Sequence, residues 1–387
     1  MESQVPRQNK PEAQVPPAGK RKAVLFIAKL ALSVTSLVIL FLLAEAALRL
    51  VGAKPQTATV LTSYFQFNSQ TGWTGRPNAA SRFCTTNFDV FITHTADGLR
   101  RCGLDMPIDE DDGSESEVVW CMGDSGTWGW GVGHGETYVE RLNNMTHDSR
   151  IYRNLGMCGF SSVQQYFLLK ENLELDRIPD QVVLLFCEND LGENLDKKDQ
   201  DPPRPYLEEV GGRFDIQNYP TPVSRGWNMR KWLKNKSLAY NHLDFHIMRA
   251  KTAINERRKR PVSTRNAELV AIEDSPERLS QYRALKTVYG MIDELCDQYN
   301  VRFAVAAWHP DELATVSRVC GELKVPVLDI TRRFQRHYQS SKEPAPIRFK
   351  TDPHLNALGH QFLAEGIHRE LERLRMARSG EPDGVKL

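Results

Sequence analysis

The feature of this sequence that most restricts its fold is a regular alternation of strand-like and helix-like segments, which begins at Val118. Short apolar runs of strand length are followed by longer stretches with helical spacing. The strand-like runs are residues 118–121, 151–155, 182–187, 301–307 and 325–328. The helical patterns lie near residues 138–145, 163–173, 280–299, 311–323 and 356–374. Alternation of this kind predicts an α/β protein built on a parallel, doubly wound sheet.

Polar stretches follow three of these strands and precede the last helix. They are Gly123-Asp124-Ser125, residues 154–159, residues 187–190 and Asp352-Pro353-His354. Because open α/β sheets bind ligands at the carboxyl ends of their strands, we expect these stretches to meet at that edge. A tight turn from a strand into a helix is also where such sheets present a reactive serine. The sequence therefore predicts one composite site.

Ser125, His354 and Asp352 have the chemistry of a nucleophile, a base and an orienting acid. A serine hydroxyl is a weak nucleophile until a base takes its proton, and imidazole titrates near neutrality. Asp352 would orient the imidazole and stabilise its charged form. The backbone N–H groups of Ser125 and Gly159 and the side-chain amide of Asn189 would bind the oxyanion. The structural alternatives are a helix N-cap for Ser125, a turn residue for Asn189 and a fastening of the last helix for His354.

One strongly apolar stretch, residues 23–51, lies near the amino terminus. Its centre, residues 30–44, is uncharged, and with its flanks it reaches the length of about 20 residues that spans a bilayer. Residues 1–22 are rich in Pro, Gln and Lys, which predicts a disordered tail, and their basic residues predict a cytoplasmic amino end. The rest of the chain would then lie outside the cytoplasm. A signal peptide cleaved near Ala44-Glu45-Ala46 and a buried core helix are the alternatives.

Two regions surround or interrupt the alternating pattern. Residues 52–117 are expected to be a linker that approaches the core, with a short strand near residues 88–95. Residues 196–276 form an insertion within a domain of residues 118–380, with a hairpin predicted at Gly211-Gly212. The insertion also holds a basic run at residues 257–260. This run is expected to be a solvated surface, and binding of an anionic substrate or headgroup is the alternative.

The cysteines and the charge balance exclude several classes of protein. Cys84 and Cys102 flank the predicted short strand and form either a disulfide or two unrelated thiols. The seven cysteines include no CxxC pair and no cluster with histidine at zinc spacing, so we expect no metal and no cofactor. With 50 Lys and Arg against 49 Asp and Glu, the chain has no global charge to attract nucleic acid.

The polar stretches together resemble the four blocks of the SGNH/GDSL hydrolases, a family of lipases and esterases. Ser125, Gly159, Asn189 and the pair Asp352 and His354 stand at the positions of those blocks. The forms Gly-Asp-Ser-x-Thr-x-Gly-x-Gly-Val and His-x-Asn-x-x-Gly-His are similar to those of a membrane-anchored bacterial branch. The resemblance covers about residues 23–51 and 118–374. It implies a flavodoxin-like three-layer α/β/α sandwich preceded by one transmembrane helix.

Two positions depart from the family's pattern. Cys187 stands where the third block usually has glycine, which would narrow the pocket. The last block has one residue between Asp352 and His354, whereas two are more common, and the more common position is occupied here by Thr351. Either Asp352 still reaches His354, or another carboxylate such as Asp329 orients it.

The resemblance implies a serine ester hydrolase that removes acyl groups, above all O-acetyl groups, through an acyl-enzyme at Ser125. For an anchored protein the implied substrate is an acylated small molecule or carbohydrate outside the cytoplasm, such as cell-envelope or exported polysaccharide. An O-acyltransferase that uses the same site, a weakly catalytic carbohydrate-binding module and a lipase are the alternatives. Trp128 and Trp130 are expected to pack in the core or turn, with a sugar-stacking platform as the alternative.

Overall fold

Five parallel strands form the sheet at the centre of the fold. The computed structural model describes residues 18–56, 63–102, 116–146, 149–175, 177–197, 203–223, 229–258, 275–341 and 343–379. The strands are β5 (Glu117–Met122), β6 (Arg150–Asn154), β7 (Gln181–Leu185), β10 (Arg302–Ala307) and β11 (Val327–Asp329). Their order across the sheet is β11-β10-β7-β5-β6, with every neighbouring pair parallel. This is the flavodoxin-like order, which reverses direction beside β5, and the predicted fold class is confirmed.

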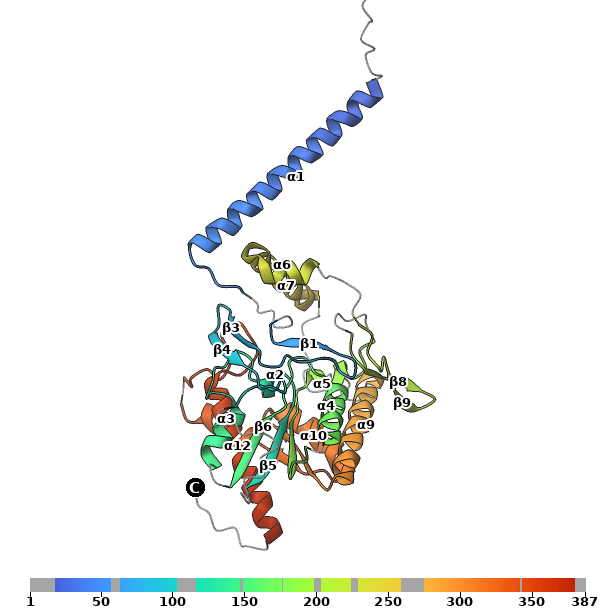
Figure 1. The fold of residues 1–387 in the computed structure, drawn as a ribbon, viewed down its shortest axis with the longest axis vertical. Helices are drawn as coiled ribbons and strands as arrows, with labels where there is room; N and C mark the ends of the chain where they lie inside the picture. Colours follow the sequence, from blue (N-terminus) through green and yellow to red (C-terminus); the bar gives the residue numbers. More distant parts are fainter. Residues whose placement is uncertain are drawn as a thin grey trace, which may run out of the picture.

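Helices cover both faces of the sheet (Figure 1). One face packs against α4 (Ser162–Glu174), α9 (Pro276–Gln298) and α10 (Pro310–Leu323). The other packs against α3 (Tyr138–Thr146), α11 (Thr331–Gln339) and α12 (Ala357–Ser379). Trp120 of β5 enters the first core and Cys121 enters the second, because successive strand residues point to opposite faces. The sequence predicts each of these helices except α11.

The apolar amino-terminal stretch forms a long helix, α1 (Ala18–Leu50), which extends away from the body of the molecule (Figure 1). Its part Leu25–Leu50 is long and apolar enough to cross a membrane, with a mean hydropathy of 2.4 over its most apolar window. None of that window is buried against the described residues. Signal sequences share this length and composition.

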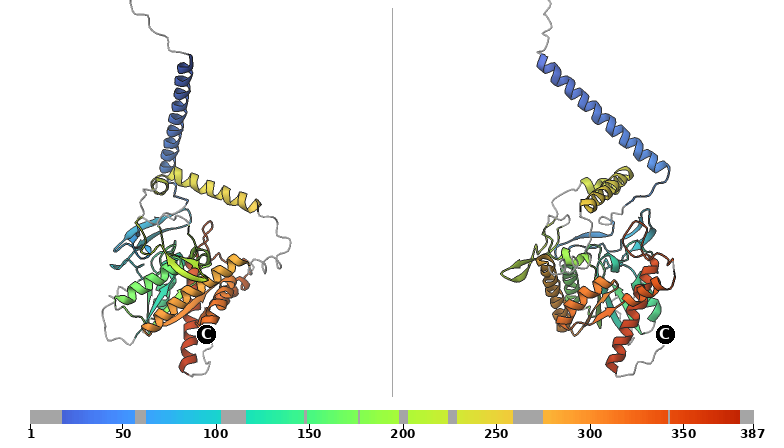
Figure 2. Two further views of the ribbon diagram at one scale, coloured as in Figure 1. Left: turned by 90° about the vertical axis from the view of Figure 1, so that its right-hand side faces the viewer. Right: turned by 180° about the vertical axis from the view of Figure 1, so that it is seen from behind.

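The described residues of the insertion form a hairpin and two helices. Strands β8 (Tyr206–Val210) and β9 (Arg213–Gln217) pair across Gly211 and Gly212, so the predicted hairpin is confirmed. Helices α6 (Met229–Lys236) and α7 (Leu238–Arg258), which the sequence does not predict, lie beside the carboxyl end of α1 (Figure 2). The basic run begins in the last turn of α7, and its remaining residues lie outside the described part of the chain.

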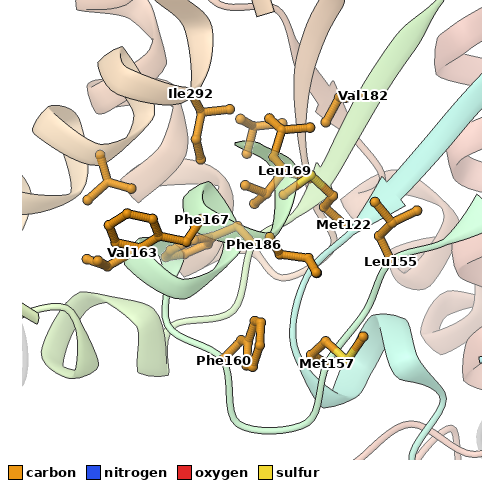
Figure 3. Close-up of a cluster of buried hydrophobic side chains, with 14 of the residues drawn as sticks. Met122, Leu155, Met157, Phe160, Val163, Phe167, Leu169, Val182, Phe186 and Ile292 are labelled. Atoms are coloured by element: carbon orange, nitrogen blue, oxygen red, sulfur yellow. The ribbon is translucent and has the colours of Figure 1, made fainter. Parts of the chain in front are cut away.

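The first core extends beneath the carboxyl edge of the sheet. Figure 3 shows Met122 and Phe186 there, beside Phe167 and Leu169 of α4 and Ile292 of α9. All five side chains are at most 3% exposed. Burying a side chain of this size stabilises the fold by roughly 1.5–3 kcal/mol. Because Met122 and Phe186 immediately precede two of the predicted site loops, those loops begin on a closely packed base.

Two antiparallel hairpins occupy the region that was expected to be a linker. Strand β1 (Phe65–Asn68) pairs with β2 (Gly72–Gly75), and β3 (Ala80–Cys84) pairs with β4 (Asp89–Thr93), the predicted short strand. Their aromatic side chains pack around Trp128, which ends the short helix α2 (Ser125–Trp128). The ring centroids of Tyr64, Phe65 and Phe83 lie 5.6, 5.7 and 6.0 Å from that of Trp128. The hairpins therefore form a wall around the helix that begins at Ser125.

All seven cysteines belong to the described residues, and each is a free thiol. Cys84 ends β3 and is partly exposed, whereas Cys102 is buried in the second core beside α3. The alternative of two unrelated thiols is therefore the correct one.

Candidate active site

Ser125 begins α2 directly after β5, at the reversal of strand order. Gly123 makes the turn with φ +152°, and a Cβ there would lie 2.3 Å from Oγ1 of Thr127, so another residue would clash. Asp124 caps the helix, because its Oδ1 accepts a hydrogen bond of 2.8 Å from the N–H of Gly126. The sharp turn presents Ser125 at the carboxyl edge of the sheet, where ligands bind in this class of fold.

Ser125, His354 and Asp352 form a continuous hydrogen-bonded chain. Oγ of Ser125 lies 2.8 Å from Nε2 of His354, and Nδ1 of His354 lies 2.6 Å from Oδ1 of Asp352. The backbone N–H of His354 donates to the same oxygen at 3.0 Å, so one intervening residue is enough to bring the carboxylate to the ring. Burial of Asp352 opposes its ionisation, but hydrogen bonds from His354 and Trp130 outweigh this and lower its pKa. The carboxylate therefore stays charged beside the imidazole.

Trp130 is a fourth member of this chain. Its Nε1–H donates to Oδ2 of Asp352 at 2.9 Å, and its ring stacks on His354 with centroids 4.9 Å apart and planes at 19°. Trp128, by contrast, is fully buried in the core, as expected. The expectation that Trp130 only packs in the turn misses this contact. No sequence pattern could connect it to a residue 222 positions later.

Asp329, the alternative orienting acid, serves another purpose. Its Oδ1 accepts hydrogen bonds from the N–H and the hydroxyl of Thr331, at 3.0 and 2.5 Å, at the start of α11. Thr351, at the acid position that is more common in the family that the sequence resembles, donates its N–H to Oδ1 of Asn87 at 3.0 Å. The acid loop is thus tied to the turn between β3 and β4, and Asp352 is the acid that contacts His354.

The expected oxyanion donors lie on the loops that follow β6 and β7. Gly159 is exposed and has φ +73°, a conformation that glycine adopts readily. Because glycine has no side chain, a substrate can approach its N–H closely. No hydrogen bond within the described residues uses that N–H. Asn189 is also exposed and begins the short helix α5 (Asn189–Glu193). Both residues stand at the edge of the sheet that carries Ser125, and their role as oxyanion donors stays a prediction.

Arg204, which the sequence does not single out, connects these two loops. Its guanidinium is 5% exposed, and Nη1 donates to the carbonyl of Gly159 at 3.2 Å and to Oε2 of Glu193 at 3.1 Å. Glu193 ends α5, the short helix that begins at Asn189. Arg204 therefore ties the Gly159 loop to the helix that carries Asn189. Because Arg204 precedes β8, the insertion contributes directly to the site.

Cys187, at a position where the family that the sequence resembles usually has glycine, supports the turn after β5. Its thiol donates to Oδ1 of Asp124 at 3.2 Å, the same oxygen that caps α2. Burial raises the pKa of Cys187 well above its ordinary value, so the thiol keeps the proton that it donates. The substitution reinforces the turn that holds Ser125, and a neutral thiol is a poor nucleophile.

Three other polar residues near this edge have structural contacts. Nδ1 of His360 accepts the N–H of Tyr138 at 3.3 Å inside the second core. His309 caps α10, and Asp190 is fully buried beneath the third loop. Among the residues that the structure describes, no group of three or more His, Cys, Asp or Glu side chains could hold a metal ion.

Comparisons with known proteins find distant similarity. No family model and no curated protein matches the chain. Among solved structures it is similar to a member of the lipolytic protein G-D-S-L family from Veillonella parvula, with 14% identity, 67% of this chain and 100% of that chain covered, and a TM-score of 0.36. The psychrotrophic esterase EstA from Pseudoalteromonas sp. has 9% identity, coverage of 67% and 98%, and a TM-score of 0.37. An acetyl xylan esterase from Geobacillus stearothermophilus has 13% identity, coverage of 67% and 95%, and a TM-score of 0.35.

Proposed function

We propose that this chain is a serine ester hydrolase of the SGNH/GDSL type, which forms an acyl-enzyme at Ser125. The observation that carries the proposal is the chain of hydrogen bonds from Oγ of Ser125 through His354 to Asp352, at 2.8 and 2.6 Å. A hydroxyl in this setting loses its proton to the imidazole as it attacks an acyl carbonyl. The four sequence blocks that resemble this family support the same proposal.

The reaction proceeds in two halves. His354 takes the proton of Ser125 as Oγ attacks the ester carbonyl, and Asp352 stabilises the imidazolium. The N–H groups of Ser125 and Gly159 and the amide of Asn189 bind the negatively charged oxygen. His354 then gives the proton to the departing alkoxide, which leaves as the alcohol. In the second half, His354 activates a water molecule that hydrolyses the acyl-enzyme.

The proposed location is outside the cytoplasm, on a domain anchored by α1. The residues that precede the apolar part of α1, Leu25–Leu50, include a cluster of basic residues, which favours a cytoplasmic amino end. These residues are Arg7, Lys10, Lys20, Arg21 and Lys22. The proposed substrate is an O-acetylated carbohydrate of the cell envelope or an exported polymer, in line with the resemblance to the anchored branch.

Hydrolysis of p-nitrophenyl acetate by the full chain in detergent tests the chemistry. Ser125→Ala and His354→Ala should each lower kcat at least roughly 10³-fold, since the members of such a triad act as a unit. Ser340→Ala, at an exposed serine that ends α11, is the matched control and should keep the wild-type rate. Equal rates for all four proteins would refute the proposal. A fluorophosphonate should modify Ser125, and mass spectrometry of the labelled peptide identifies the modified serine.

The fate of the acyl group distinguishes the proposed hydrolase from an O-acyltransferase that uses the same acyl-enzyme. Free acetate should be the product even when an acceptor oligosaccharide is present in excess. Acetylated oligosaccharide as the main product would assign the transferase. A series of p-nitrophenyl esters tests the lipase alternative, because activity that rises beyond the butyryl ester would favour it.

A further inference from the structure

We infer that helices α6 and α7 form a surface that rests on the lipid headgroups of the membrane spanned by α1. This inference requires the proposed anchor but not the proposed reaction. The two helices lie at the carboxyl end of α1 (Figure 1). Figure 2 shows α7 running sideways from that end, rather than along α1. A helix in this orientation beside a membrane span lies along the bilayer surface.

Hydrogen bonds fix the start of α7 to the last turns of α1. One carboxylate oxygen of Glu45 accepts from the hydroxyl of Ser237 at 2.8 Å and from the N–H of Ala239 at 2.9 Å, and so caps α7. Nη2 of Arg49 donates to the carbonyl of Lys236 at 2.9 Å. Glu45 and Arg49 lie where the apolar part of α1 ends. The junction of α6 and α7 is therefore held at the level where a bilayer's hydrocarbon would give way to headgroups.

The side of α7 that faces away from the body is apolar. Asn241 accepts a hydrogen bond of 2.7 Å from the backbone of residues 54–56, and His242 contacts a carbonyl of the same segment at 3.0 Å. With about 3.6 residues per turn, Leu243 and Ile247 fall on the opposite side of the helix. They are 51% and 45% exposed, which is high for large apolar side chains.

Near Leu243 and Ile247, helices α6 and α7 carry a tryptophan and several basic residues, which are the residue types that interact favourably with lipid headgroups. Trp232 of α6 is 47% exposed, and tryptophan is enriched where membranes meet water. Lys236, Arg249 and Lys251 are exposed, and both helices hold more basic than acidic residues. Apolar side chains within a basic rim match an anionic lipid surface. Because α6 and α7 are hydrogen-bonded to the end of α1, this surface would lie next to any bilayer that α1 spans.

Photocrosslinking in the full chain tests the contact directly. The chain is reconstituted into vesicles of phosphatidylcholine and phosphatidylglycerol, and p-benzoylphenylalanine replaces Leu243, Ile247 or Leu175, one at a time. Leu175 is the matched control, because it is 59% exposed and follows α4 at the opposite edge of the sheet. Mass spectrometry should find lipid adducts at positions 243 and 247 at least several-fold above position 175. Removing phosphatidylglycerol should lower their yield.

Two results would overturn the inference. One is an equal yield of lipid adducts at positions 247 and 175. The other is crosslinking of position 247 mainly to a second copy of the chain. If the chain does not float with the vesicles in a density gradient, α1 is not a membrane anchor, and the inference fails with it. The crosslinking variants should hydrolyse p-nitrophenyl acetate at the wild-type rate, so failure of this inference and failure of the proposed reaction are read separately.

Discussion

Trp130 donates its indole N–H to Oδ2 of Asp352, while Oδ1 of the same carboxylate contacts His354. Both oxygens of the acid are therefore held before any substrate binds. The stacked indole ring also restrains the imidazole from one side. An acid fixed in this way can sit one residue closer to its histidine than is common in the family that the sequence resembles.

Trp130→Phe should lower kcat for p-nitrophenyl acetate roughly 10- to 100-fold, with little change in KM. The substitution keeps an aromatic ring on His354 but removes a hydrogen bond to a charged group, worth about 1.5–3 kcal/mol. Because the indole acts through the acid, adding Trp130→Phe to Asp352→Asn should cost little more. Additive losses in the double variant would contradict this role.

Asp352→Asn should lower kcat roughly 10⁴-fold, because an amide neither stabilises the imidazolium nor holds the required tautomer. The control is Asp329→Asn, which removes a carboxylate of equal size from the start of α11. That variant should keep near-wild-type kinetics. The opposite ranking of the two variants would make Asp329 the orienting acid.

Arg204→Lys should lower kcat about 10²-fold, since lysine cannot hold both Gly159 and Glu193 and the oxyanion donors would shift. The effect belongs to the transition state, so KM should change little. Arg213→Lys, at an exposed position of β9, is the control. The melting temperatures of both variants show whether a loss of activity comes from displaced oxyanion donors or from a less stable fold. A rise in KM alone would argue that Arg204 binds substrate instead.

Glu312→Gln should stabilise the protein increasingly as the pH rises from 5 to 9. Burial raises the pKa of Glu312 from 4.5 to about 8, helped by the carboxylates of Asp124 and Glu188 and opposed by Arg348. Between these pH values the folded chain binds more protons than the unfolded chain, so the wild type loses stability as the pH rises, by roughly 3–5 kcal/mol in all. The melting temperatures of wild type and variant should diverge over this range.

The control for this titration is Glu294→Gln, at an exposed position on α9. It should leave the pH dependence of melting unchanged. A Glu312→Gln protein whose melting temperature runs parallel to the wild type at every pH would show that Glu312 is already ionised in the folded state.

The sheet could be predicted because its strands are encoded locally. β7 is buried along its whole length, so it reads as a continuous apolar run. The helix α11 has no such signal, because only Thr331 and Phe334 among its residues are buried. The strands β1 and β3 also lack a clean alternation, since each has a single buried side chain, Phe65 and Phe83 respectively.

The residues Ser125, His354 and Asp352 could be predicted from the sequence, but the side chains that hold them in place could not. Ser125 lies in a turn whose chemistry is contained in three successive residues, and the acid and base lie within one short loop. Trp130 and Arg204 act on residues 222 and 45 positions away, respectively, at contacts that only the folded chain creates. Cys187 illustrates the same limit, because its contact with Asp124 spans two strands of the sheet.

The hairpins around Trp128 also have a consequence for biosynthesis. Tyr64, Phe65 and Phe83 leave the ribosome before the residue that they enclose. Until Trp128 follows, these aromatic side chains lack the ring around which they pack in the folded chain. The cover of the nucleophile can therefore close only after β5 and the turn that carries Ser125 have been synthesised.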